Sequence, residues 1–484
     1  MSLHDAYHWP SRTPSRKGSN IKLNKTLQDH LDELEEQFTI PTELLHRVTD
    51  RFVSELYKGL TTNPGDVPMV PTWIIGTPDG NEHGSYLALD LGGTNLRVCA
   101  VEVQGNGKFD ITQSKYRLPQ ELKVGTREAL FDYIADCIKK FVEEVHPGKS
   151  QNLEIGFTFS YPCVQRSIND ASLVAWTKGF DIDGVEGESV GPLLSAALKR
   201  VGCNNVRLNA ILSDTTGTLV ASNYASPGTE IGVIFGTGCN ACYIEKFSEI
   251  PKLHKYDFPE DMNMIINCEW CDFDNQHVVL PRTKYDVAID EESPRPGLQT
   301  YEKMIAGCYL GDILRRILLD LYEQGALFNG QDVTKIRDPL AMDTSVLSAI
   351  EVDPFENLDE TQTLFEETYG LKTTEEERQF IRRACELIGT RSARLSACGV
   401  CALVRKMNKP SMIVGTDGSV YNLYPRFKDR LAQAFKDILG EEIGSKVVTI
   451  PAEDGSGVGA ALVSALEAKG KALTSDILAE HLKN

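Results

Sequence analysis

The stretch YLALDLGGTNLRVCAVEV, residues 86–103, decides the fold. Its two halves, Tyr86–Leu91 and Leu96–Val103, are rich in apolar and β-branched residues, and Gly92-Gly93-Thr94-Asn95 separates them. This pattern predicts two strands joined by a glycine turn. Glycine lets the backbone approach a phosphate closely, and consecutive N–H groups then bind the anion. The turn is therefore a candidate phosphate-binding site.

A second stretch repeats this pattern much later in the chain. Ile231–Phe235 and Ala241–Glu245 flank the turn Gly236-Thr237-Gly238-Cys239-Asn240, in which Thr237 takes the place of Thr94. The weak repeat suggests a duplicated α/β unit with one phosphate-binding hairpin in each half.

Strands and helices alternate along the rest of the chain, which indicates an α/β architecture. We expect strands near 153–159, 206–212, 412–414 and 447–450, and helices near 127–145, 192–201, 301–324 and 425–439, with a final helix opened by Gly455. Residues 27–60 predict two helices broken at Pro41, and residues 375–406 predict two helices that meet near Gly389 or Gly399.

Bulk composition limits the class of protein. A chain of 484 residues is too long for a single core, so two or more lobes are expected. The net charge of −19 argues against a nucleic-acid or membrane-surface partner. No unbroken apolar run reaches the roughly 18 residues of a membrane span, and the polar N-terminus lacks a signal-peptide core. The cytosol is therefore the expected compartment.

The 12 cysteines are expected to be reduced thiols, because disulfide frameworks belong to small secreted domains. Three C-x-x-C pairs, Cys239/Cys242, Cys268/Cys271 and Cys398/Cys401, leave a zinc site open as an alternative. Buried packing is favoured, since the first pair lies in a strand-like segment and the third in an apolar helix-like run. Residues 1–20 predict a flexible tail, in which Ser19 follows basic residues. This segment resembles a phosphorylation site, with a merely basic tail as the alternative.

Two aspartates lie at strand ends. Asp90 precedes the first glycine turn, where a carboxylate near phosphate suggests an intervening Mg²⁺ held through water; the alternative is a turn-stabilising Asp. Asp214 follows the apolar strand 208–212 and is a candidate general base for a hydroxyl nucleophile, with a helix N-cap as the alternative.

Sugar recognition requires several donors and acceptors that converge on hydroxyl groups. Thr177, Lys178, Asn240, Glu269 and Glu302 are candidates. Taken alone, Glu302 also fits a solvated residue in the first turn of a helix.

Together these motifs resemble the hexokinase family, and fungal hexokinases in particular. They are LALDLGGTNLRV at 87–98, GFTFSYP at 156–162, WTKGFD at 176–181, SDTTGTL at 213–219, GTGCNACY at 236–243, NCEWCDFDN at 267–275, PRTKYDVAIDEESPRPG at 281–297 and DGSGVGAAL at 455–463. The resemblance covers roughly Leu27 to Leu466.

The resemblance implies a two-lobed, actin-like (ribonuclease-H-like) ATPase fold with a ligand cleft between a small and a large lobe. The expected boundaries are a tail at 1–20, large-lobe helices at 21–75, the small lobe at 76–212, the large lobe at 213–457, and a C-terminal helix and tail at 458–484 that return to the small lobe.

The same resemblance implies a role for each matching residue. Asp214 is the expected catalytic base, with Lys178 beside it. The expected sugar-binding residues are Ser160, Thr177, Lys178, Ser213, Asp214, Asn240, Glu269 and Glu302. The expected ATP-binding residues are Asp90, Gly92, Gly93, Thr94, Asn95, Thr237, Gly238, Gly418 and Ser419, with Asp90 near the Mg²⁺.

The implied activity is ATP-dependent phosphorylation of glucose, fructose or mannose at the 6-hydroxyl by a cytoplasmic protein that is a monomer or a weak homodimer. A non-catalytic hexose sensor and a chaperone-like ATPase are the alternatives on the same fold. Two positions depart from the family pattern: Ser213 replaces an Asn, and Cys271 replaces a Gly. Both bear on sugar affinity and preference.

Overall fold

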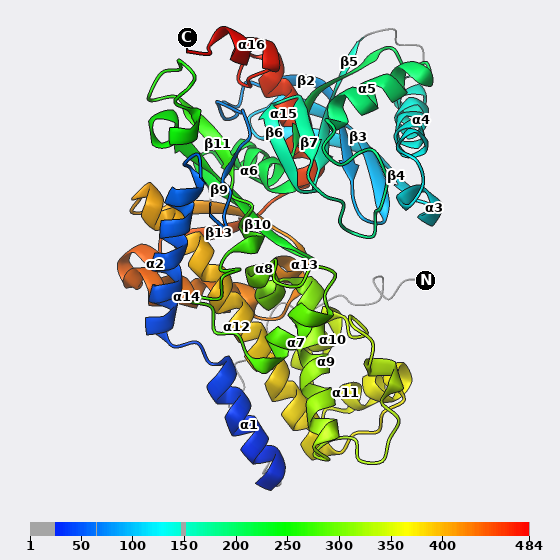
Figure 1. Cartoon of the computed structure of the whole chain (residues 1–484), viewed down its shortest axis with the longest axis vertical. Coiled ribbons are helices and arrows are strands. Elements are labelled where there is room, and N and C mark those ends of the chain that lie inside the picture. The colour runs from blue at the N-terminus through cyan, green and yellow to red at the C-terminus, as the bar shows by residue number, and fades with distance from the viewer. Residues whose placement is uncertain (1–24, 64, 147–151, 484) are drawn as a thin grey trace.

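The computed structural model describes residues 25–63, 65–146 and 152–483, so the tail at 1–20 with Ser19 lies outside the described residues. Two mixed sheets dominate it (Figure 1). The smaller sheet has the order β4 (Lys108–Arg117), β3 (Asn95–Gly105), β2 (His83–Leu91), β5 (Leu153–Phe159) and β8 (Val206–Leu212). The larger has the order β1 (Val70–Pro71), β11 (Asn263–Asn267), β10 (Cys239–Lys246), β9 (Thr229–Phe235), β12 (Met412–Asp417) and β13 (Val447–Pro451).

The two sheets repeat one topology. In the smaller sheet β3 pairs antiparallel with β4 and β2, and β5 pairs parallel with β2 and β8. In the larger sheet β10 pairs antiparallel with β11 and β9, and β12 pairs parallel with β9 and β13. The duplicated α/β unit predicted from the two glycine-turn hairpins is therefore confirmed.

The molecule has two hydrophobic cores, and the smaller sheet contributes to both: Leu87 and Leu89 belong to the smaller core and Ala88 to the larger. The smaller core lies between this sheet and α4 (Arg127–Val145) and α5 (Val190–Arg200), and its residues all fall between Leu87 and Ile211. Beside it lies a two-stranded ribbon of β6 (Cys163–Ser167) and β7 (Asp170–Leu173).

The larger core extends from its sheet through the helices in the lower part of Figure 1. These are α1 (Lys25–Phe38), α2 (Thr42–Gly59), α7 (Lys284–Glu292), α8 (Thr300–Ile305), α9 (Gly307–Glu323), α10 (Thr344–Val352), α11 (Asp359–Leu364), α12 (Glu375–Met407), α13 (Ser419–Leu423) and α14 (Phe427–Gly444).

Two helices join the sheets. α6 (Asp214–Ala225) follows β8 but packs on the larger sheet, whereas α15 (Gly455–Ala468) follows β13 but packs on the smaller one. They cross closely: a Cβ at Gly459 would lie 2.3 Å from the Gly217 carbonyl oxygen, and a Cβ at Gly217 would lie 2.3 Å from the Gly455 carbonyl oxygen. Glycine is required here because backbone approaches backbone.

Two helix predictions are wrong. Residues 375–406 lie in one helix, α12, whose 33 residues end at Met407, because Gly389 and Gly399 admit the side chains of Tyr424 and Trp270 instead of breaking the helix. The predicted helix at 301–324 is divided at Ala306, where the backbone is extended (φ −84°, ψ 150°) and α9 starts anew. Gly455 opens α15 as expected, but the short α16 (Ser475–Glu480) follows it.

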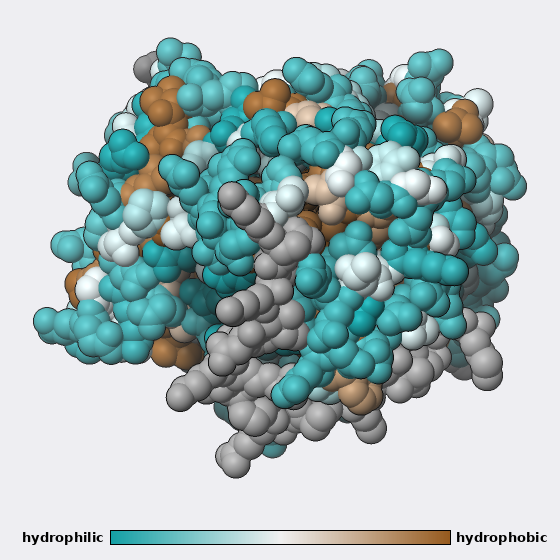
Figure 2. Space-filling model, turned by 90° about the horizontal axis from the view of Figure 1, so that it is seen from below, coloured by the Kyte–Doolittle hydropathy of each residue, from teal (hydrophilic) through white to brown (hydrophobic). Residues whose placement is uncertain are grey.

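α12 is also the one helix in the described ranges whose length and composition would allow a membrane span, yet 89% of its most apolar window is buried inside the protein. It is therefore a core helix. Seen from below, the surface is mostly hydrophilic, with separate hydrophobic patches (Figure 2).

Candidate active site

Asp214 is the first residue of α6, directly after β8. Its Oδ1 accepts a hydrogen bond from the Thr215 N–H at 2.8 Å. Partial burial raises the pKa of Asp214 by desolvation, although the positive charge of Lys178 and hydrogen bonds from Thr215 and Ser160 act in the opposite direction. The carboxylate is thus shifted toward the pKa range of a useful base.

The helix N-cap is Ser213 and not Asp214, so the structural alternative for Asp214 is wrong. The Ser213 hydroxyl accepts from the Thr216 N–H at 3.3 Å and lies 3.0 Å from the Thr215 hydroxyl and 2.9 Å from the Thr216 hydroxyl. Because Ser213 caps the helix, the Asp214 carboxylate is not needed as the cap.

Lys178 approaches from the smaller sheet. Its Nζ donates to the Ser160 carbonyl at 2.7 Å and lies 4.9 Å from the centre of the Tyr161 ring. The Ser160 hydroxyl is buried and lies close to the Asp214 carboxylate, whose pKa it lowers. Thr177 is half-buried beside Lys178.

Asn240 and Glu269 belong to one amide–carboxylate network on the larger sheet. The Asn240 amide donates to Glu269 at 3.0 Å and to Asn267 at 2.8 Å, and its Oδ1 accepts from the Glu269 N–H at 3.0 Å. Asn267 also donates to Glu269, at 2.5 Å. Desolvation, with the charges of Asp214 and Glu302, raises the pKa of Glu269 to about 7.

Glu302, in the first turn of α8, is not the solvated residue that its local sequence suggests. It accepts from the Cys239 N–H and from the Gln299 amide, both at 2.8 Å. Desolvation is the main reason why its pKa rises to about 7, and the charges of Asp272 and Asp214 add to it.

Both glycine turns lie at this site. A Cβ at Gly93 would lie 3.1 Å from Cβ of Lys178, so the first turn, Gly92–Asn95, lies against the lysine. A Cβ at Gly238 would lie 2.7 Å from the Glu302 carboxylate. Thr94 and Thr237, one in each turn, are exposed and available to a ligand.

Gly418 and Ser419 join the second turn. Gly418 has φ +110°, and a Cβ on it would lie 2.3 Å from the Phe235 carbonyl oxygen. A Cβ at Gly236 would in turn lie 3.7 Å from the Ser419 nitrogen. The large-lobe residues expected to bind ATP are therefore contiguous.

Asp90 belongs to a network of charged and polar side chains that the sequence does not predict. Its Oδ2 accepts from Arg97 at 3.3 Å and from the Ser456 hydroxyl at 2.9 Å, and Arg97 also contacts Asp454 at 2.6 Å. The other oxygen, Oδ1, makes no hydrogen bond to the described residues, and the side chain is 25% exposed. A carboxylate with one oxygen open to water fits a Mg²⁺ held through water.

The expected charged residues form one electrostatic cluster around Asp214. Its charge interacts with those of Lys178 and Asp90, and Glu302 interacts with Lys178 as well. Sequence reasoning missed Asn267, Gln299 and Ser456, although all three lie within or next to the motifs quoted above. Among the described residues, no group of three His, Cys, Asp or Glu side chains is arranged to hold a metal ion.

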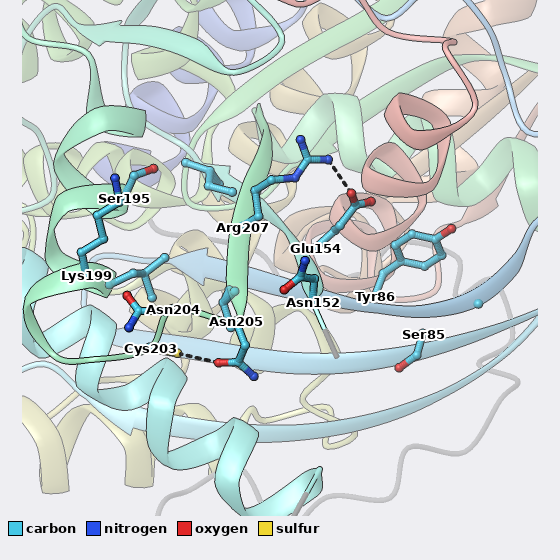
Figure 3. Close-up of a pocket in the computed structure, with 14 residues that line it drawn as sticks. Ser85, Tyr86, Asn152, Glu154, Ser195, Lys199, Cys203, Asn204, Asn205 and Arg207 are labelled. Atoms are coloured by element: carbon cyan, nitrogen blue, oxygen red, sulfur yellow. Dashed lines mark hydrogen bonds and ion pairs between the residues drawn. The ribbon is translucent and has the colours of Figure 1, made fainter. Parts of the chain in front are cut away.

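A cavity of about 850 Å³ lies elsewhere, at the starts of β5 and β8 (Figure 3). Glu154, Arg207 and Asn205 line it, and Arg207 and Glu154 pair with each other. None of the expected site residues lines this cavity.

Two family models, both described as hexokinase, match residues 30–224 and 230–466. The chain belongs to the hexokinase family. It is 49% identical to a Kluyveromyces lactis hexokinase over 95% of this chain and 96% of that protein, and 50% identical to an Emericella nidulans hexokinase over 95% of each. Its structure matches a Schistosoma mansoni hexokinase complexed with glucose, with a TM-score of 0.83 and 33% identity over 91% of this chain and 99% of that one.

These comparisons confirm the resemblance to fungal hexokinases and the actin-like ATPase fold. The protein is a hexokinase that uses ATP to phosphorylate a hexose.

Proposed function

We propose that this hexokinase transfers the γ-phosphoryl group of Mg-ATP to the 6-hydroxyl of glucose, fructose or mannose, with Asp214 as general base. The observation that carries the proposal is the position of Asp214. It is the first residue of α6 and does not cap the helix, its pKa is raised, and the positive charge of Lys178 lies nearby. The Schistosoma mansoni relative, complexed with glucose, supports glucose as one substrate.

Sugar hydroxyls bind between the two halves of the site in this proposal. On the larger lobe, the Asn240 amide donates and accepts hydrogen bonds, and the Glu269 and Glu302 carboxylates accept them. On the smaller lobe, the Ser160 and Thr177 hydroxyls donate and accept, and the Lys178 ammonium donates. The position of the buried Ser160 hydroxyl beside the Asp214 carboxylate, whose pKa it lowers, supports this assignment. Ser213 contributes less, since capping already occupies its hydroxyl.

Phosphate groups bind at the two glycine turns. The Gly92 N–H closes the first turn on the Asn95 carbonyl at 3.0 Å. The N–H groups of Gly93, Thr94 and Asn95 and of Thr237 and Gly238, with the hydroxyls of both threonines, stabilise negative charge on the transferred group. Asp90 would hold Mg²⁺ through water, and the ion would neutralise charge on the phosphate oxygens. Gly418 and Ser419 contact the adenosine.

Asp214 accepts the proton of the 6-hydroxyl as the new bond to phosphorus forms. Lys178 lies beside the transferred group and offsets its charge. Water would compete with the sugar at an open site, so we propose that sugar binding closes the lobes and completes the site. The proposed small lobe is 76–212 with the returning segment 458–484, and the large lobe is 21–75 with 213–457. A monomer or weak homodimer in the cytoplasm stays a prediction.

Initial rates with glucose, fructose and mannose, measured through ADP release and through NMR of the phosphorylated sugar, test this function. We expect sugar 6-phosphates in a one-to-one ratio with ADP and little ADP without sugar. Hexose binding without turnover would instead indicate a sensor, and ATP hydrolysis without sugar would indicate a chaperone-like ATPase.

A further inference from the structure

Arg295 lies on a loop of the larger lobe, and its side chain contacts the smaller lobe. The loop, residues 293–299, connects α7 to α8 and contains Pro294 and Pro296. Arg295 is half-buried, and its guanidinium donates to the Trp176 carbonyl at 3.5 Å. The two residues belong to different lobes, so this contact crosses from one lobe to the other.

A buried charge pair fixes the shape of this loop. The Asp290 carboxylate accepts from the Gly297 N–H at 3.1 Å and from Lys303 Nζ at 2.6 Å. The Lys303 side chain is 3% exposed, and its ammonium also donates to the carbonyls of Arg295 and Leu298, each at 2.7 Å. Because charge-assisted hydrogen bonds hold both sides of Arg295, its side chain projects from a rigid base.

Trp176, whose carbonyl accepts from Arg295, is also held firmly in place. The Trp176 ring stacks on Phe180 at 5.1 Å and meets Tyr161 edge-on at 5.2 Å, and its indole N–H donates to the Ile182 carbonyl at 3.2 Å. The Trp176 N–H donates to Glu186 at 2.8 Å. Thr177 and Lys178 follow directly, so the carbonyl that Arg295 contacts belongs to the segment proposed to bind the sugar.

The loop also leads into the sugar site on its own lobe. At its end, Gln299 donates from its side chain to Glu302 at 2.8 Å and from its backbone to Asp272 at 2.8 Å. One short segment therefore contacts Glu302 on the larger lobe and the residue before Thr177 on the smaller lobe.

We propose that Arg295 is a positioning residue that latches the two lobes over the bound sugar through the Trp176 carbonyl. The inference rests on the proposed sugar-induced closure. A donor–acceptor distance of 3.5 Å is at the outer limit of a hydrogen bond, so the bond gains most of its strength when the lobes move closer. Arg295 then stabilises the closed state more than the open state, and it lowers the sugar concentration needed for closure.

The test compares Arg295→Ala with wild type in glucose titrations followed by small-angle scattering and by initial rates. Loss of a hydrogen bond from a charged donor corresponds to roughly a tenfold effect. We therefore expect the glucose concentration for half-maximal compaction, and the KM for glucose, to rise about tenfold. The kcat at saturating glucose, and the melting temperature without sugar, should stay close to wild type.

Arg316→Ala is the matched control, because Arg316 is a partly exposed arginine that pairs with Glu292 next to the same loop but contacts only the larger lobe. It should leave both glucose midpoints unchanged. Arg295→Lys retains the charge but not the fork of donors and should give an intermediate shift; it also serves if Arg295→Ala does not fold.

An unchanged glucose midpoint in Arg295→Ala would overturn the latch while leaving the proposed function intact. A second contrary outcome is that Arg295→Ala lowers the free energy of unfolding without sugar by as much as it weakens the free energy of glucose binding. That result would show a merely structural role for Arg295 and would overturn the latch as well. If wild type itself does not become more compact with glucose, closure is wrong, and the latch is wrong with it.

Discussion

At the scale of single residues, Ser213 and Asp214 divide two tasks at the start of α6. Ser213 caps the helix with its hydroxyl, and Asp214 is left to face Lys178 and Asp90. The sequence predicts Asp214 as a candidate base because a carboxylate follows a buried strand. It cannot decide between base and cap, since both patterns place an acid at that point. The hydrogen bonds assign the cap to Ser213, and the role of Asp214 as base stays a prediction.

Ser213→Asn should lower the KM for glucose by several-fold to about tenfold, with little change in kcat. An Asn amide offers both donors and an acceptor to sugar hydroxyls, whereas the Ser213 hydroxyl is engaged by its own helix. Asn caps helices about as well as Ser, so α6 should stay intact. Initial rates with glucose and fructose measure the effect. An unchanged or higher KM would show that another residue, with Cys271 the first to examine, compensates for the serine.

The kcat/KM for glucose should fall as pH decreases below about 7. Burial raises the pKa of Glu269 and of Glu302 to about 7, so these groups gain protons in that range and lose capacity to accept hydrogen bonds from the sugar. A profile from pH 5.5 to 8.5 tests this, with kcat/KM for Mg-ATP at saturating glucose as the control for titration of the nucleotide. A glucose profile that is flat between pH 6 and 8 would contradict the assignment.

Glu302 illustrates what local sequence cannot give. An acid in the first turn of a helix is ordinarily solvated, and nothing within α8 indicates otherwise. Its burial depends on the Cys239 N–H and the Gln299 amide, and Cys239 is 63 residues away in sequence. The sequence makes Glu302 one of several candidates for sugar recognition, and its burial becomes visible only in the fold.

At the scale of elements, the strongly periodic segments were predicted well and the polar edge strand was not. The helix at Arg127–Val145 and the strands at Leu153–Phe159 and Val206–Leu212 are as expected. β4 was missed because it is an edge strand in which exposed and half-buried residues alternate, without a buried face. α12 was divided in error because glycine usually weakens a helix, whereas here it makes room for aromatic side chains.

Gly459→Ala should lower the melting temperature by several degrees. The added Cβ would lie 2.3–2.5 Å from backbone atoms of Gly217, so α6 and α15 must separate, and overpacking of this kind costs about 1–3 kcal/mol. Gly76→Ala is the control, since its Cβ would meet only the flexible Lys471 side chain, at 3.1 Å. Equal melting temperatures for the two variants would contradict the tight helix crossing.

The C-x-x-C pairs should bind no zinc. Both members of Cys398/Cys401 are fully buried in α12, and Cys239, Cys242 and Cys268 are buried as well. Burial raises the pKa of Cys398 to about 12, which disfavours the thiolate that zinc requires. Metal analysis of the purified protein should find far less than one zinc per chain, and a stoichiometric content would overturn the packing interpretation.

At the scale of the whole molecule, two sheets of like topology meet at α6 and α15 (Figure 1). The residues proposed to bind the sugar are divided between the two halves. A sugar that binds both halves should draw them together. Small-angle scattering should give a smaller radius of gyration at saturating glucose than without sugar. Galactose, which differs at one hydroxyl, serves as a comparison sugar, and an identical profile with and without glucose would contradict closure.

The most direct test of the account is the kcat of Asp214→Ala with glucose and Mg-ATP, measured together with its glucose-dependent compaction. If Asp214 is the base, kcat should fall by at least ~10²–10⁴, the range for the loss of one acid–base group, while glucose still closes the lobes because the other sugar ligands remain. A variant that closes on glucose and turns over at a nearly normal rate would contradict the central claim.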